Sequence, residues 1–206
     1  GRASFASLRA IGKPIDLAIF AIPQEAVDAA VDDAIAAGVR NIVLFSSGYA
    51  ELGAAGAAAQ QLLATKTRAA GIRVLGPNCL GMMNVANQIY ATFTPAPNAG
   101  RVPLGRIGLV SQSGAFGAYA YSMARERGIG LSHWVTTGNE VDVQVADCIA
   151  WMATDPATEV IMAYMEGCQD GPRLCAALAL AQSQRKPVVM VKVGTTAIGA
   201  AATASH

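Results

Sequence analysis

The sequence has few charged side chains, few aromatic ones and only two histidines. Of its 206 residues, 14% are charged and 6% aromatic, whereas 53% are hydrophobic. Fifteen basic residues against fourteen acidic ones give a formal net charge of +1, and the chain contains no basic run. This composition excludes extended disorder, and it argues against a nucleic-acid partner, because proteins bind phosphate backbones through clustered lysine and arginine. A folded protein with a full apolar core is expected.

Cysteine is scarce as well, and its spacing excludes the common zinc sites. The four cysteines form no C-x-x-C pair and lie at Cys79, Cys148, Cys168 and Cys175. We interpret them as reduced thiols of a cytoplasmic protein. No apolar stretch reaches the roughly 18 residues of a membrane span, so no membrane partner is expected. The chain lacks an initiator methionine and stops abruptly at His206, which suggests a piece of a longer protein.

Apolar, β-branched runs alternate with alanine-rich helical stretches, a pattern typical of strand-helix units on a parallel sheet. The first set of units predicts strands over 16–22, 41–45 and 73–75, with helices over 24–37 and 55–70. The second set predicts strands over 106–110, 131–136, 159–164 and 187–191, with helices over 114–127, 144–153 and 173–183. Between them, 94–105 holds three prolines and two glycines and is interpreted as a linker. The sequence therefore predicts an α/β fold with a first domain over 1–98 and a doubly wound parallel-sheet domain over 104–206.

A tight serine and glycine turn, Ser111-Gln112-Ser113-Gly114, joins a predicted strand to a predicted helix. Free backbone N–H groups, the positive end of the helix dipole and two hydroxyls meet at such a junction, and this combination suits a phosphoryl group or a carboxylate. An ordinary capped helix explains the same residues equally well. Ligands of doubly wound folds bind beyond the carboxyl ends of the strands, where this turn is expected to lie.

Five motifs that follow one another along the chain carry a resemblance to a known family. They are GPNCLG from Gly76, IGLVSQSGAFG from Ile107, Thr137-Gly138-Asn139 with Asp142 and Asp147, YMEG from Tyr164, and GTTAIGAAATASH from Gly194 to His206. In this order they resemble the nucleoside-diphosphate-forming acyl-CoA synthetases, including ADP-forming acetate-CoA ligase, and more distantly the alpha subunit of succinyl-CoA synthetase. The likeness covers nearly the whole chain.

The resemblance implies a Rossmann-like CoA-binding domain over 1–98, with its N-terminal part missing, and a flavodoxin-like domain over 104–206. It implies an enzyme, an acid-thiol ligase that interconverts acyl-CoA, ADP and phosphate with a carboxylic acid, CoA and ATP. The intermediates would be an acyl phosphate and a phosphohistidine. ADP or ATP and Mg²⁺ would be bound mainly by an ATP-grasp domain or subunit outside this chain, and an oligomer is expected.

The family's phosphoryl site gives roles to several residues of this chain. The S-x-S-G helix start holds the phosphoryl group, and with the neighbouring turn it corresponds to Ser111, Gln112, Ser113, Gly114, Gly138 and Asn139. His206 stands at the position of the phosphorylated histidine, and Glu166 at that of the acid that orients its ring. Thr195 replaces the family's arginine, and the chain ends before the Thr-Gly that follows the histidine.

The family's contacts with CoA fall on three turns of the first domain. The corresponding residues are Ile22, Pro23, Ser46, Ser47, Gly48, Glu51, Gly76, Pro77 and Asn78. Glycine and serine allow backbone amides to approach phosphates and the pantetheine chain closely. Each turn taken alone is equally consistent with a plain strand-to-helix connection.

Two other functions remain open at this point. The same two domains occur as CoA-sensing or acyl-CoA-sensing modules that regulate a fused protein such as an acetyltransferase. A serine hydrolase is the other alternative, with His133 or His206 as base, although neither serine of the turn fits G-x-S-x-G. The presence of both His206 and Glu166 favours catalysis by phosphoryl transfer, whereas Thr195 counts slightly against it. Without a companion motif, His133 is interpreted as a packed or surface histidine.

Overall fold

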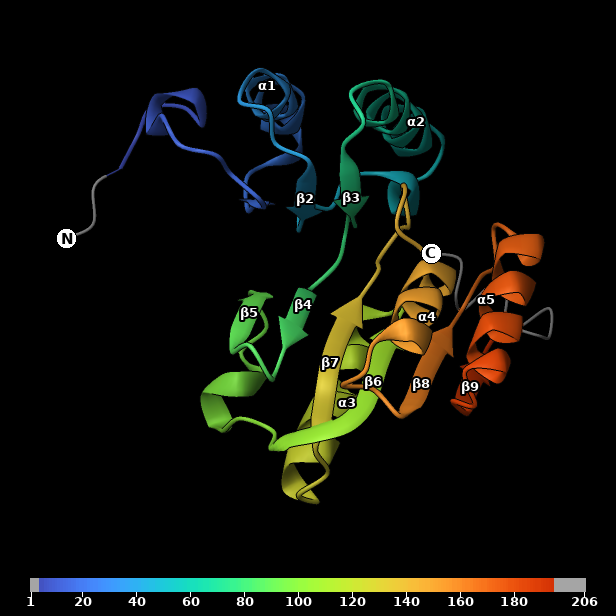
Figure 1. Ribbon diagram of the computed structural model, residues 1–206. Coiled ribbons are helices and arrows are strands. Elements are labelled where there is room, and N and C mark those ends of the chain that lie inside the picture. The colour runs from blue at the N-terminus through green and yellow to red at the C-terminus, as the bar shows by residue number, and fades with distance from the viewer. Residues whose placement is uncertain (1–3, 195–206) are drawn as a thin grey trace.

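A computed structural model describes residues 4–194 and contains two β-sheets, each with helices packed on it (Figure 1). The first sheet has three parallel strands in the order β1-β2-β3. Its elements are β1 (Ala18–Phe20), α1 (Gln24–Ala36), β2 (Asn41–Leu44), α2 (Ala54–Ala69) and β3 (Arg73–Leu75). Both helices lie on the same side of this sheet (Figure 1). The predicted parallel arrangement of the first domain is confirmed.

Apolar residues at helical spacing attach α1 to this sheet. Val27, Val31 and Ala34 occur at i, i+4 and i+7, are buried, and share one core cluster with Ile42 and Leu44 of β2. The helix follows a proline, which is well suited to a helix start, and a glycine in the left-handed region lies just beyond its end. The sequence pattern predicted both ends of this helix to within one residue.

The second sheet has six strands in the order β5-β4-β7-β6-β8-β9. Its strands are β4 (Gly81–Asn84), β5 (Ile89–Thr92), β6 (Leu104–Ser111), β7 (Leu131–Thr136), β8 (Val160–Met165) and β9 (Val188–Lys192). The helices are α3 (Gly114–Glu126), α4 (Val145–Thr154) and α5 (Gly171–Ser183). Short 3₁₀ turns occupy Arg9–Ile11, Ala50–Leu52 and Ala96–Ala99.

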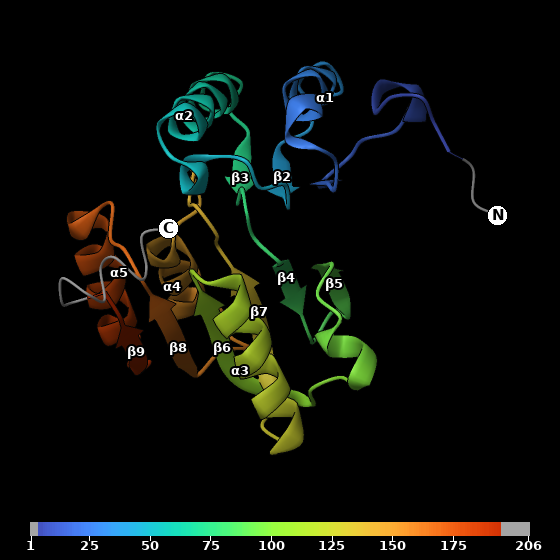
Figure 2. The same ribbon diagram turned by 180° about the vertical axis from the view of Figure 1, so that it is seen from behind.

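Helices cover both faces of the second sheet, as a doubly wound fold requires. Figure 2 shows α3 on one face, where Tyr121 meets Trp134 of β7 edge to face at 6.3 Å. Helices α4 and α5 pack on the other face, where Ile149 and Met152 share a core cluster with Ile161 of β8. The flavodoxin-like α/β class is therefore confirmed. Among the described residues, no helix has the length and apolar character that crossing a membrane requires.

The strands β4 and β5 were not predicted from the sequence, where no strand was expected between 76 and 105. Both strands belong to the second sheet, although the predicted division had placed them in the first domain, over 1–98. β4 pairs antiparallel with β5 and with β7, so Met83 lies opposite Trp134. The sheet is therefore mixed rather than wholly parallel. Two methionines and an asparagine give β4 little intrinsic strand preference, and its pairing with the edge of β7 determines its conformation.

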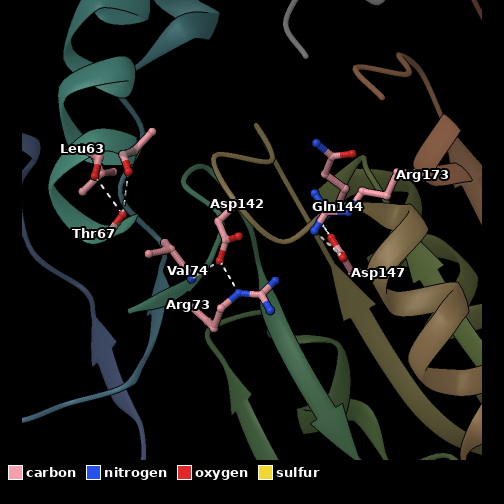
Figure 3. A network of polar contacts seen from close by, with 9 residues as sticks. Leu63, Thr67, Arg73, Val74, Asp142, Gln144, Asp147 and Arg173 are labelled. Atoms are coloured by element: carbon pink, nitrogen blue, oxygen red, sulfur yellow. Dashed lines mark hydrogen bonds and ion pairs between the residues drawn. The ribbon is translucent and has the colours of Figure 1, made fainter. Parts of the chain in front are cut away.

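The two sheets are joined by hydrogen bonds as well as by the chain itself. The segment after β7 runs back along β3 and its continuation: the N–H groups of Asn139, Val141 and Val143 donate to the carbonyls of Pro77, Gly76 and Val74 at 2.9, 3.0 and 3.1 Å. In Figure 3, the Asp142 side chain of this segment points toward Arg73 and Val74 of β3. Its Oδ2 accepts from Arg73 Nε at 2.7 Å and from the backbone N–H of Val74 at 3.0 Å. The loop between β7 and α4 is thus fixed to the first sheet.

Candidate functional site

The serine turn lies at the carboxyl edge of the second sheet, between β6 and α3. Ser113 is the N-cap of α3, and its Oγ accepts a hydrogen bond from the backbone N–H of Phe116 at 3.3 Å. The Ser111 hydroxyl is buried and donates to the carbonyl of Ser113 at 2.6 Å, so it shapes the turn from inside. A Cβ on Gly114 would come within 2.9 Å of the Leu80 side chain, which explains the small residue here. The start of α3, with its backbone N–H groups and positive dipole end, has the chemistry that suits an anion.

Gln112 connects this turn to the end of β8. The residue is 2% exposed. Its Oε1 accepts hydrogen bonds from the backbone N–H groups of Glu166 and Gly167 at 2.7 and 2.8 Å. Its own N–H donates to Tyr164 and its carbonyl accepts from Gly138. Three segments that the sequence assigned to one site therefore meet at a single residue.

Glu166 follows β8 on the same edge and is partly buried. Burial raises the pKa of Tyr164, and the nearby Glu166 carboxylate raises it further. The Tyr164 ring stacks on Phe116 of α3, with ring centroids 4.0 Å apart. An apolar aromatic surface thus adjoins the carboxylate and the start of α3.

Glu140 is a buried acid of this region to which the sequence analysis gave no role. Its Oε1 accepts hydrogen bonds from the Thr137 hydroxyl and the Val145 N–H, each at 2.8 Å. Burial raises its pKa to about 7, although these hydrogen bonds and one from Gln112 act to lower it. The backbone of Glu140 is left-handed, with φ 58°. The sequence held a signal for this residue, an acid placed directly after Thr137-Gly138-Asn139 and shortly before a helix.

Asn139 connects the second sheet to the predicted CoA residues of the first. Its Nδ2 donates to Glu51 Oε2 at 2.5 Å and to Gln60 Oε1 at 3.0 Å, and its Oδ1 accepts from Asn78 Nδ2 at 3.1 Å. Gly138 has φ 62°, and a Cβ there would lie 2.2 Å from the Pro77 carbonyl oxygen. Only glycine allows the two turns to come this close.

The predicted CoA residues line the carboxyl edge of the first sheet. Four of them, Ile22, Pro23, Ser46 and Ser47, line an open cavity of about 470 Å³ together with Ala21, Gln24, Phe45 and Phe93. Phe93 comes from the segment after β5, and its ring centroid lies 4.9 Å from that of Phe45. Sequence reasoning missed Phe93, because it is far from the first sheet along the chain.

The remaining predicted CoA residues form the wall next to Asn139. Glu51 accepts the N–H of Gly48 at 2.6 Å, and the N–H of Asn78 donates to the Ser46 carbonyl at 2.9 Å. Burial acts to raise the pKa of Glu51, but hydrogen bonds from Asn139 and from backbone N–H groups outweigh it and lower that pKa. The left-handed Gly76, with φ 107°, begins the Gly76-Pro77-Asn78 turn. Glu51 is therefore held as a carboxylate between the two sheets.

His133 lies inside the second sheet, away from the serine turn. It is 4% exposed, packs edge to face on Trp151 at 4.7 Å, and has Nδ1 3.4 Å from Asp155. Burial lowers its pKa. It pairs with Gly108, three residues before Ser111 on β6, which corresponds to about 10 Å along a strand. It is therefore a packed histidine, out of reach as a base for either serine.

His206 and Thr195 lie outside the described residues. Within residues 4–194, no group of three or more His, Cys, Asp or Glu side chains is placed to hold a metal ion.

Two family matches cover most of the chain. Residues 104–206 match the family described as succinyl-CoA ligase like flavodoxin domain. Residues 1–85 match the family described as CoA binding domain.

Individual relatives agree with these matches. Acetate–CoA ligase (ADP-forming) I of Archaeoglobus fulgidus is 36% identical over 98% of this chain and 29% of its own length. The alpha subunit of acetate–CoA ligase (ADP-forming) I of Pyrococcus furiosus is 35% identical over 98% of this chain and 43% of its own length. A solved structure of dinucleotide forming acetyl-coenzyme A synthetase 1 from Ca. Korarchaeum cryptofilum, in complex with phosphate and ADP, superposes with a TM-score of 0.91 at 32% identity. The superposition covers 100% of this chain and 43% of the solved chain. This chain therefore spans less than half of each of these three proteins.

Proposed function

This chain belongs to the succinyl-CoA ligase-like flavodoxin domain family, and from that premise we propose that it forms part of an ADP-forming acyl-CoA ligase. The names of the relatives support this activity, and they give no support to a regulatory CoA-sensing module. The observation that carries the proposal is the meeting of the serine turn, the Gly138-Asn139 turn and the Glu166 segment at Gln112. Three motifs far apart in the sequence thereby form one edge.

The proposed reaction has three balanced steps. Phosphate attacks the acyl-CoA carbonyl, the carbon–sulfur bond breaks, and acyl phosphate and CoA form. His206 then takes the phosphoryl group and releases the carboxylate. The phosphohistidine finally passes the phosphoryl group to ADP, which regenerates the imidazole and gives ATP. In reverse, the same steps make the thioester from acid, CoA and ATP.

The described residues supply binding and orientation for these steps. The N–H groups at the start of α3, capped by Ser113, offer hydrogen bonds and a positive dipole end to the phosphoryl oxygens. In this reaction Glu166 would accept a hydrogen bond from one nitrogen of the His206 ring and leave the other as the nucleophile. The stacked pair of Phe116 and Tyr164 forms an apolar wall for the small carboxylic acid.

CoA is assigned to the carboxyl edge of the first sheet, in the cavity beside Ser46 and Ser47. The match of residues 1–85 to a CoA binding domain supports this assignment. ADP and Mg²⁺ are assigned to an ATP-grasp domain or subunit outside this chain, in an oligomeric enzyme. We place the enzyme in the cytoplasm, because all four cysteines are free thiols.

The test is to incubate the protein that carries this chain, with its ATP-grasp part, with radiolabelled ATP and Mg²⁺. We expect acid-labile, base-stable label on His206, absent in His206→Asn and retained in His133→Gln, which removes the other histidine. A protein that binds CoA but takes up no label would overturn the proposed function.

A further inference from the structure

Gln112 uses one side-chain amide to hold two parts of the proposed site. β8 ends at Met165, and the next two N–H groups, those of Glu166 and Gly167, both donate to Gln112 Oε1. These are short hydrogen bonds, 2.7 and 2.8 Å, to a side chain that is almost wholly buried. The position of the Glu166 backbone, and hence of its carboxylate, therefore depends on where the Gln112 amide lies.

Glu140 lies near the same residue: the Gly138 N–H donates to the Gln112 carbonyl at 3.1 Å, and Gln112 acts to lower the pKa of Glu140. Glu140 has its own fixed surroundings, because Thr137 and the first N–H of α4, that of Val145, hold Oε1 at 2.8 Å each. A carboxyl group held in this way can accept from the Gln112 amide and so set the rotation of that amide about its last bond. Glutamine suits this position because one group both accepts and donates. Methionine would do neither, and glutamate would set two carboxyl groups against each other.

Glu140 follows Asn139, the residue bound to Glu51 at the edge of the first sheet. A chain of contacts thus runs from the Gly48 turn through Glu51 and Asn139 to the neighbouring Gly138, whose N–H donates to the Gln112 carbonyl, and from Gln112 to the backbone of Glu166. The chain uses only hydrogen bonds and one peptide bond. The two halves of the proposed site are therefore held in one frame.

We propose that Gln112 is a positioning residue for phosphoryl transfer, which holds Glu166 in place and is itself oriented by Glu140. This inference rests on the proposed function, because it gives Glu166 its purpose. It adds to that function a pair of residues that are required for transfer without touching the phosphoryl group.

The test exchanges the two side-chain groups. Q112E keeps an oxygen for the N–H groups of Glu166 and Gly167 but loses the donor to Glu140. The double variant Q112E/E140Q restores a donor at the other end, since the new amide at position 140 donates to the new carboxylate at 112. The exposed Gln182→Glu on α5 is the matched control for the added charge.

Phosphohistidine formation and the Kd for CoA are measured in the full protein with its ATP-grasp part. We expect Q112E to slow phosphoryl transfer about tenfold or more, the double variant to recover most of that loss, and the Kd for CoA to change less than about threefold. Gln182→Glu should match wild type. Transfer at the wild-type rate in Q112E, or a double variant no faster than Q112E, would overturn the proposal.

Amide hydrogen exchange at Glu166 and Gly167 separates this inference from the proposed function. Exchange at these two amides should be faster in Q112E and return toward wild type in the double variant. If wild type forms no phosphohistidine, the proposed function fails and the catalytic role of Gln112 fails with it, whatever the exchange shows. If wild type is labelled but exchange at these amides is unchanged in Q112E, only the role of Gln112 fails. If Q112E does not fold, the double variant alone tests the proposal. The double variant must then fold and carry out phosphoryl transfer for the proposal to stand.

Discussion

The side-chain amide of Asn139 donates to the carboxylate of Glu51 across 2.5 Å and thereby joins the loop after β7 to the turn after β2. Each partner is held from its own side. Backbone N–H groups of Gly48 and Tyr49 bind Glu51, and Asn78 binds Asn139. Because these residues come from both sheets, the contact belongs to the interface on which the proposed reaction depends.

Asn139→Ala should remove this contact and leave a partly buried carboxylate short of one donor. We expect a loss of about 1–3 kcal/mol in the free energy of unfolding and weaker CoA binding. Urea denaturation and calorimetric titration with CoA measure the two effects. Asn41→Ala is the control, because Asn41 also donates to an oxygen, the Asp16 carbonyl at 2.9 Å, but at an exposed position. Equal losses in both variants would contradict a special role for Asn139.

Glu166→Gln should leave the fold and the Kd for CoA nearly unchanged, because its backbone N–H still reaches Gln112. An uncharged amide orients an imidazole less well, so phosphoryl transfer should slow by about tenfold or more. Rapid-quench measurement of phosphohistidine formation checks this. The control is Glu159→Gln, which removes an exposed carboxylate paired with Arg106. Unchanged transfer in Glu166→Gln would remove this residue from the mechanism.

Ser113→Ala removes the N-cap of α3 and should lower the free energy of unfolding by about 1 kcal/mol. It should also reduce the amount of phosphohistidine that persists, since the helix start loses its order. Asp170→Ala provides the comparison: Asp170 caps α5 by accepting the Arg173 N–H at 2.9 Å. Both variants should lose similar stability, and only Ser113→Ala should lose phosphohistidine. A normal yield of phosphohistidine in Ser113→Ala would contradict the proposal that the start of α3 holds the phosphoryl group.

Glu140→Gln should change how stability depends on pH. Burial raises the pKa of Glu140 from 4.5 to about 7, so between these values the folded protein keeps a proton that the unfolded chain has released. The free energy of unfolding therefore falls as the pH rises through this range. Between pH 5 and pH 8 we expect wild type to lose roughly 3 kcal/mol more than Glu140→Gln. If urea denaturation gives the same change in the free energy of unfolding between the two pH values for both proteins, Glu140 does not titrate in this range.

Much of the fold could be predicted from the sequence, because local pattern and structure agree there. The helix predicted over 24–37 corresponds to α1, and the strand Arg73–Leu75 was placed without error. The β4 and β5 pair could not be predicted, since its strand conformation comes from pairing with β7 rather than from its own residues. The resemblance to the acyl-CoA synthetases was confirmed by the family matches.

The sequence named residues that lie together in the structure, but it did not predict the hydrogen bonds that connect them. The motifs included Gln112 and Glu166, and both lie at the carboxyl edge of the second sheet, where the serine turn was expected. Glu140 was missed because its importance comes from burial and from partners that the sequence does not place beside it. The roles given to His206, Glu166 and the CoA residues stay predictions until the variants are measured.

The hydrogen bonds from 139–143 to the edge of β3 have a consequence for how this chain can be recombined. They close the outer edge of the first sheet with a segment from the other half of the chain. A piece cut after Leu75 would expose that edge and the apolar surface of Val43 and Leu75, which favours aggregation. The halves are not interchangeable modules: a chimaera with a first half from a relative would also need that relative's segment between β7 and α4.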